Sequence, residues 1–193
     1  MLLYKDIVRD GHEVLKMNAN DVKIPLSKED EDTLIAMNEY LMNGYDDEFI
    51  ANNDIRPGVG IAAPQIGISK KMFCIATFDE KGDFHNYCVI NPKIISHSEE
   101  LTYLESGEGC LSVNEDYKGL IHRYKRIKAR VTLYDPIKRA TFDAFLQLKG
   151  YLAIVFQHEY DHLFGKLFYE RINKHNPFYI PENSKPVVFK REN

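Results

Sequence analysis

The chain has 193 residues, 44% of them hydrophobic, so it can bury one sizeable core, and no linker-like segment separates two folding units. We therefore expect one domain over residues 1–193, located in the cytoplasm, without a signal peptide or a membrane span. The formal net charge of −4 provides no general attraction to nucleic-acid phosphates, although it does not exclude a local basic patch. Three cysteines are too few, and odd in number, for a disulfide framework.

The first predicted element is an amphipathic helix between Ser27 and Gly44. Ser27 and Asp30 form a capping-box pattern, Leu34 and Leu41 recur at helical spacing, and Gly44 provides a stop. Residues 45–57, rich in Asp, Asn and Pro and without an apolar period, are predicted to form an exposed loop or insertion, where function is not expected to start.

Strands dominate the middle of the sequence. Residues 72–78 and 87–95 are short β-prone runs, and two strictly alternating runs follow at 127–133 and 142–148. Strands and helices do not alternate regularly, so we expect an α+β fold with mostly antiparallel sheets around a central helix. The tail from residue 176 is interrupted by prolines, with a last short strand expected at 187–189.

The most informative stretch lies in the predicted helix Tyr151 to Phe164, which Gly165 is placed to terminate in a left-handed conformation. An apolar stripe of Leu152, Phe156 and Leu163 is expected to bury this helix. Opposite this stripe stand His158 and His162, four residues apart and thus on one face, with Glu159 beside them. Two such imidazoles can bind one metal ion while the glutamate activates water, which favours metal-assisted hydrolysis.

Two histidines leave a four-coordinate catalytic ion in need of a third protein ligand. The place six residues after His162, which is a histidine in one class of zinc protease, is Phe168 here. Glu182 has the spacing of a downstream glutamate ligand, but it stands in an irregular tail and remains a weak option. Cys110 lies between glycines and serine in Glu-Gly-Cys-Leu-Ser, where a thiolate is accessible, and is the better candidate.

Upstream, residues 58–65 read Gly-Val-Gly-Ile-Ala-Ala-Pro-Gln, a run of small residues beside which an extended peptide could bind. The run lacks the following Lys-Ser/Thr of a phosphate-binding loop and the last glycine of a dinucleotide fingerprint. A nucleotide site is therefore not expected here.

Together the three segments resemble the peptide deformylase family, whose motifs are Gly-x-Gly-x-Ala-Ala-x-Gln, Glu-Gly-Cys-x-Ser and Gln-His-Glu-x-Asp-His, in this order. All three occur here without a departure. The resemblance covers most of residues 1–172 and is greatest to the longer form of the family, found in Gram-positive bacteria and their wall-less relatives. It implies a metal held by Cys110, His158 and His162, with Glu159 as catalytic acid/base and Gln65 and the Leu111 amide polarising the carbonyl.

The implied reaction is hydrolysis of the N-formyl group from the initiator formylmethionine of nascent polypeptides, releasing formate. Water activated by the metal attacks the formyl carbon, and Glu159 transfers the proton to the leaving amine. The expected substrate contacts are the main chain of Val59 and Gly60 and a methionine pocket walled by Tyr151 and Val155, which share a helix face with His158.

The surroundings of the site are less defined. Glu108 and Asp161 are expected to orient the ligands and fix histidine tautomers, whereas Arg123 is expected on the surface. Cys74 and Cys88 are expected to pack as small apolar groups.

The family's native ion is Fe(II), and Zn(II), Ni(II) or Co(II) suit the same ligands in purified protein. The expected partners are formylmethionyl nascent peptides. Contact with the ribosome stays open, because the tail offers no terminal helix for docking. No specific nucleic acid and no membrane are expected. The alternatives are a zinc endopeptidase using the same histidines with Glu182, and a structural metal site closed by a fourth protein ligand.

Overall fold

The computed structural model describes residues 1–190, whose regular structure consists of two sheets, three α-helices and four short 3-10 helices. The larger sheet has the order β1-β2-β3-β6-β7, with every neighbouring pair antiparallel. Its strands are β1 (Gly60–Ala62), β2 (Met72–Phe78), β3 (Phe84–His97), β6 (Arg126–Asp135) and β7 (Ala140–Lys149). The predicted α+β class with mostly antiparallel strands is confirmed.

The smaller sheet has the order β5-β4-β8, and its pair β4-β8 is parallel. Its strands are β4 (Leu101–Tyr103), β5 (Arg123–Tyr124) and β8 (Ser184–Pro186). The chain between β4 and β5, residues 104–122, is a long connection that carries the cysteine motif to the centre of the molecule.

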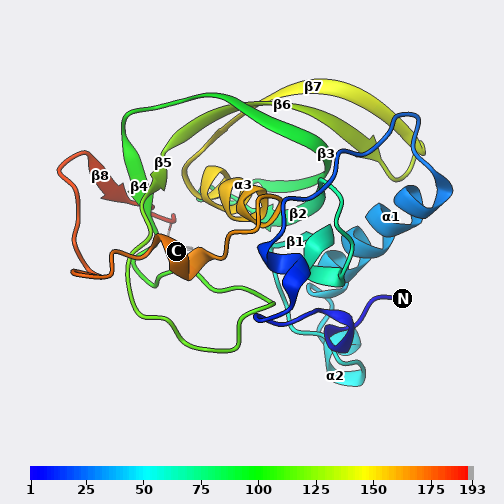
Figure 1. The fold of residues 1–193 in the computed structure, drawn as a ribbon, viewed down its shortest axis with the longest axis horizontal. Helices are drawn as coiled ribbons and strands as arrows, with labels where there is room; N and C mark the ends of the chain where they lie inside the picture. The colour runs from blue at the N-terminus through cyan, green and yellow to red at the C-terminus, as the bar shows by residue number, and fades with distance from the viewer. Residues whose placement is uncertain (191–193) are drawn as a thin grey trace.

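Helix α3 (Gly150–His162) lies at the centre of the fold, with β6 and β7 curving over it (Figure 1). The predicted stripe of Leu152, Phe156 and Leu163 is buried, and the Phe156 ring packs edge-on against Phe73 of β2 at 5.1 Å between centroids. Because burial of such side chains contributes about 1.5–3 kcal/mol each, this stripe fixes the helix against the sheet.

The end of α3 confirms the predicted role of Gly165. The Gly165 N–H donates to the His162 carbonyl oxygen at 3.3 Å, and the Lys166 N–H donates to the Asp161 carbonyl oxygen at 3.1 Å. This pair of bonds is a Schellman motif, which needs a left-handed residue. Gly165 provides it with φ 65°.

Helix α1 (Lys28–Asn43) is the predicted amphipathic helix, and it packs on the face of the large sheet opposite α3 (Figure 1). The Ser27 hydroxyl accepts a hydrogen bond from the Asp30 N–H at 3.1 Å, as the capping pattern predicted. Leu34 and Leu41 are fully buried in the cluster between helix and sheet.

Three local predictions are corrected. Residues 45–57 are not all loop, because α2 (Asp47–Asn52) forms there, started by the Asp46 side chain accepting from the Phe49 N–H at 2.9 Å. Strand β3 extends beyond the predicted 87–95 at both ends, since its register with β2 and β6 continues. The last strand is Ser184–Pro186 rather than 187–189, because Ser184 pairs with Leu101 and sets the register with β4.

Among residues 1–190, each helix is too short or too polar to cross a lipid bilayer.

Candidate active site

A cavity of about 290 Å³ opens between strand β1, the cysteine loop and α3. Its walls include the nine predicted residues Val59, Gly60, Gln65, Cys110, Leu111, Tyr151, Val155, His158 and Glu159. Of the predicted site residues His162 alone is outside this lining, and it is buried directly behind it. Arg56 and Pro57 also line the cavity, so the segment in which function is not expected to start ends in its wall.

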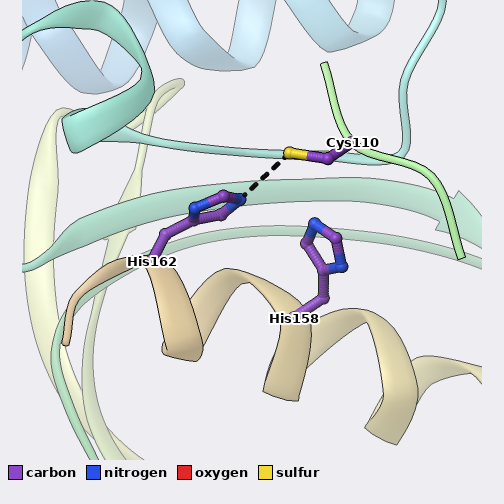
Figure 2. A group of neighbouring side chains, drawn as sticks. All are labelled: Cys110, His158 and His162. Atoms are coloured by element: carbon purple, nitrogen blue, oxygen red, sulfur yellow. Dashed lines mark hydrogen bonds between the residues drawn. The ribbon is translucent and has the colours of Figure 1, made fainter. Parts of the chain in front are cut away.

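Cys110, His158 and His162 converge at one end of the cavity, with one ligand atom from each residue within 4.8 Å of the others. Figure 2 shows both imidazoles extending from consecutive turns of α3 towards the Cys110 sulfur. The Sγ atom of Cys110 lies 3.4 Å from Nε2 of His162. A thiolate and two imidazoles at this spacing fit the tetrahedral coordination of a divalent transition metal.

The electrostatics of these three residues favour the metal-binding form of the thiol. Burial opposes ionisation of Cys110, but the positive charge of His162 and hydrogen bonds from both imidazoles outweigh it and hold the pKa of the thiol well below its usual value. Burial likewise opposes protonation of His158, yet its hydrogen bonds to Cys110 and Glu108 raise the pKa of this imidazole.

Glu108 orients His158, as predicted. Its Oε2 lies 2.9 Å from Nδ1 of His158, which leaves Nε2 as the ring nitrogen available to a metal. Burial disfavours the charged carboxylate, but Arg123 and His158 overcome it and lower the pKa of Glu108 to about 2. Glu108 therefore stays ionised beside the imidazole.

Arg123 is not a surface residue, contrary to the prediction, since only 3% of it is exposed. Its guanidinium makes two hydrogen bonds with Glu108, at 2.6 and 2.8 Å, and a third with Asp161 at 2.9 Å. A planar guanidinium can donate to two carboxylates in this way. Burial opposes the charge of Arg123, but the two carboxylates outweigh it and raise the pKa of the guanidinium. Sequence reasoning missed it because an arginine carries no signal of its burial.

Within residues 1–190, Asp161 forms no hydrogen bond with a histidine, so its predicted role in fixing a tautomer is wrong. Its carboxylate pairs with Arg123 and, at 2.5 Å for both bonds, with Arg171. Asp161 therefore supports His158 only indirectly: it pairs with Arg123, which pairs with Glu108, and Glu108 contacts His158.

Glu159 is a buried carboxylic acid in the cavity wall. It is only 4% exposed, and its Oε2 has no hydrogen-bond partner within residues 1–190. Burial raises the pKa of this carboxyl to about 7, against the opposing charges of His158 and His162. An unpartnered, buried carboxylate beside candidate ligands fits a role in handling a proton in the cavity.

Gln65 is held in one orientation from both ends. Its Oε1 accepts from the Ala62 N–H at 2.8 Å, and its Nε2 points to Ser112 Oγ at 3.3 Å and Cys110 Sγ at 3.4 Å. The amide N–H groups therefore face the Cys110 side of the cavity. Ser112, fully buried, was not singled out from the sequence, although it closes the Glu-Gly-Cys-Leu-Ser motif.

The Leu111 N–H is a second donor near the thiol. Within residues 1–190 it donates to no protein acceptor. The loop around it is anchored because Arg9 Nη1 donates to the Leu111 carbonyl oxygen at 3.0 Å.

Strand β1 presents its open edge to the cavity. The Ala76 N–H donates to the Val59 carbonyl oxygen at 3.0 Å, and Gly60 lies opposite Ile75. Bonded pairs alternate along an antiparallel ladder, so the N–H and carbonyl of Gly60 point away from β2. A Cβ on Gly60 would lie 2.7 Å from Cδ of Glu159, which explains why glycine is needed at this close approach.

The other sequence candidates lie elsewhere. Glu182 is exposed and is not part of the Cys110, His158 and His162 group, which counts against the downstream-glutamate option. Cys74 and Cys88 are buried opposite each other in β2 and β3, as expected of packed thiols.

Fold and site together define an α+β hydrolase with a thiolate and two imidazoles beside a buried glutamate. The family model for polypeptide deformylase matches residues 4–178. Peptide deformylase 2 of Bacillus anthracis is 49% identical over 187 residues, which span 97% of this chain and 99% of that protein. The chain belongs to the peptide deformylase family, and it is an enzyme of that type.

Solved structures agree with this assignment. The peptide deformylase of Thermotoga maritima has 35% sequence identity and a TM-score of 0.65, covering 90% of this chain and 99% of that one. The Acinetobacter baumannii class I type b enzyme, in a structure with bound Met-Ala-Ser, has 30% identity and a TM-score of 0.64, covering 86% and 96%.

Proposed function

We propose that this enzyme removes the N-formyl group from the initiator formylmethionine of nascent polypeptides by metal-dependent hydrolysis. The family acts on formylated nascent peptides. The observation that carries the mechanism is the convergence of Cys110, His158 and His162 beside the unpartnered carboxylate of Glu159.

The residues present fit a divalent metal ion, because a buried thiol of lowered pKa and two imidazoles place their ligand atoms together. Cys110, His158 and His162 would hold it. When bound, the ion supplies Lewis acidity and lowers the pKa of water. Deformylases are metal-dependent; for this chain we propose Fe(II) as the native ion, with Zn(II), Ni(II) or Co(II) able to occupy the same ligands.

Glu159 is proposed as the general base and then the general acid. Its buried carboxyl, with a pKa of about 7, can accept a proton from the attacking water and return it to the departing amine near neutral pH. The unpartnered Oε2 leaves one acceptor atom for that water.

Gln65 and Leu111 are proposed to stabilise the negative charge that grows on the formyl oxygen. The Gln65 amide is preorganised by Ala62 and Ser112, so it needs no rearrangement during the reaction. The unused N–H of Leu111 supplies a second donor. Loss of one such donor typically costs about 3 kcal/mol of transition-state stabilisation.

The substrate is proposed to lie along the free edge of β1, with Gly60 donating and accepting main-chain hydrogen bonds. Val59, Tyr151 and Val155 then surround the methionine side chain, and Ile154 extends the apolar wall. The Met-Ala-Ser bound to the Acinetobacter baumannii enzyme has the methionine-first sequence that such a pocket would accept.

Because the proposed substrate is a nascent chain, we place the enzyme in the cytoplasm and predict that it meets its substrate at the ribosome.

The decisive experiment is formate release from a formyl-Met-Ala-Ser peptide by anaerobically prepared enzyme of measured metal content. Acetyl-Met-Ala-Ser and an internally quenched peptide with a blocked N-terminus serve as controls. We expect formate from the first peptide and no internal cleavage. Cleavage of the quenched peptide without formate release would replace this proposal with the endopeptidase alternative.

A further inference from the structure

The large sheet has a second exposed surface, on the side opposite α3. Ile127, Ala129 and Val131 of β6 are buried towards α3, so the alternate residues Lys128 and Arg130 face the other way. Helix α1 covers this outer face only at the end formed by Cys88, Ile90 and Tyr134. The remainder is bare, and we call its four cations, Lys93, Lys128, Arg130 and Lys149, the basic face.

The charges of the basic face are unbalanced. Within residues 1–190 no carboxylate forms an ion pair with any of its four cations. Two acids in the sheet and its border have other partners: Asp143 accepts a hydrogen bond from Thr132, and Glu100 is paired with Arg126 and Lys125. A chain of net charge −4 thus concentrates unpaired positive charge on one side of one sheet.

The register adds a cost that the fold alone does not repay. Lys93 lies directly opposite Arg130. Arg126 lies directly opposite Lys149, but Glu100 already pairs with Arg126. Like charges facing each other across an antiparallel pair are destabilising. A bound polyanion would relieve the repulsion between Lys93 and Arg130.

An aromatic ring lies among these cations. Phe145 is 63% exposed, is the cross-strand partner of Arg130, and has the Lys128 ammonium 5.3 Å from its ring centroid. Next to it, a hollow of about 630 Å³ is lined by Lys128 and Lys149 together with Ser96. Its two ammonium groups and the Ser96 hydroxyl suit a phosphate group.

We propose that the basic face binds single-stranded RNA, with phosphates on its cations and a base stacked on Phe145. A sheet surface that combines cations with an exposed aromatic ring is a recurring platform for single strands. A membrane surface is a poorer fit, because it calls for a broad apolar face rather than one ring. The contacts are to backbone and stacked base, so no sequence-specific recognition is implied.

RNA is chosen over other polyanions because the family acts on nascent polypeptides, which are made on an RNA-containing particle; this choice rests on the proposed function. The sheet order also places the two surfaces apart. Strand β1 lines the cavity at one edge, whereas the basic face lies over β3, β6 and β7 towards the other. Bound RNA would therefore leave the cavity open.

The test is fluorescence anisotropy of a labelled 12-nucleotide RNA titrated with the full chain between 50 and 200 mM KCl. The variant carries Lys128→Gln, Arg130→Gln and Lys149→Gln. A control with the same change of net charge carries Lys5→Gln, Lys81→Gln and Lys174→Gln, three exposed lysines outside the basic face. We expect at least tenfold weaker binding for the first variant and a log–log salt slope shallower by about 2, since each single-strand phosphate contact contributes about 0.7.

Phe145→Ala separates stacking from charge. It should weaken binding at least about fivefold while the salt slope stays that of the unaltered chain. Equal losses in both triple variants, or no RNA binding by the unaltered chain at 50 mM KCl, would overturn the proposal. So would binding to phosphatidylserine vesicles or polyglutamate that is as tight as binding to RNA.

Formate release from a short formyl-Met peptide is measured for every variant and should not change. Absence of formate release from the unaltered chain counts against the proposed function alone, because RNA binding is read independently.

Discussion

At the residue scale, the proposed mechanism depends on the carboxylate of Glu159. Glu159→Gln keeps the size of the side chain but removes the proton acceptor, so we expect kcat to fall by about 10² to 10⁴. The metal content should not change, because Glu159 is not in the converging group of ligand atoms. Steady-state formate release with metal analysis of the same sample checks this. A variant that loses both metal and activity would show that Glu159 acts as a ligand.

Gly60 is the second residue whose substitution should reduce the reaction rate, because it lies close to Glu159. In Gly60→Ala the new Cβ would lie 2.7 Å from Cδ of Glu159, so the carboxylate must move. We expect a large loss of kcat with the melting temperature little changed. Gly82→Ala is the matched control, because its Cβ meets nothing within 4 Å while its φ of +92° strains the backbone. It should lower the melting temperature and leave kcat intact; the same pattern in Gly60→Ala would refute the close-approach argument.

At the element scale, the buried ion network joins the cysteine loop, β5 and α3. Arg123→Ala leaves Glu108 and Asp161 without their shared cation, and breaking a buried pair costs about 3–5 kcal/mol. For a chain of this size we expect the melting temperature to fall by roughly 6–20 °C. The melting temperature of Arg123→Lys should lie between those of the unaltered chain and Arg123→Ala, because an ammonium keeps the charge but cannot make the same paired hydrogen bonds.

Lys28→Ala is the control for this network. It removes an exposed pair with Asp32 on α1, which should cost less than about 0.5 kcal/mol. Thermal melts of the three variants side by side provide the comparison. A fall for Arg123→Ala no larger than that for Lys28→Ala would mean that the network adds nothing to stability.

The end of α3 provides a further prediction. In Gly165→Ala the Cβ would lie 2.5 Å from the Lys16 backbone, at a φ of +65°. Gly11→Ala has a left-handed φ of +98° but no atom within 4 Å of its Cβ. Both should be destabilised by backbone strain, and Gly165→Ala by clearly more, since the Lys16 backbone cannot easily give way. Urea unfolding of the two variants measures the difference in the free energy of unfolding. Equal losses of this free energy would mean that backbone strain alone accounts for the effect and that the contact with Lys16 adds nothing.

At the scale of the whole molecule, metal removal should destabilise the fold as well as stop the reaction. A ligand that binds only the folded state raises stability by RT ln(1 + [L]/Kd), so chelation should lower the melting temperature and re-addition of Fe(II) or Zn(II) should restore it. Cys110→Ala should lose this metal-dependent shift, whereas Glu182→Ala should keep it. The reverse result would support Glu182 as the third ligand.

The sequence by itself determined the class of the fold and the local elements that carry the candidate site, and it predicted the residues of that site. The helix of His158 and His162, its stop at Gly165, the cap at Ser27 and the class of the fold follow from spacing, and spacing is a local property of the chain. The candidate site of Cys110, Gln65, Glu159 and the two histidines was found through motifs whose residues carry unusual chemistry. These residues meet in one cavity in the structure.

Only the tertiary structure decided where charge is buried and where it is exposed. Arg123 and Lys128 are both cations near strand ends in the sequence. In the structure Arg123 is enclosed by two carboxylates, whereas Lys128 lies beside Phe145 and forms no ion pair with any carboxylate of residues 1–190. Likewise, the last strand begins at Ser184 because β4 offers a pairing edge there, although 187–189 is the more β-prone run. Burial, ion pairing and strand register depend on residues far apart in the chain, so no local pattern could have assigned them.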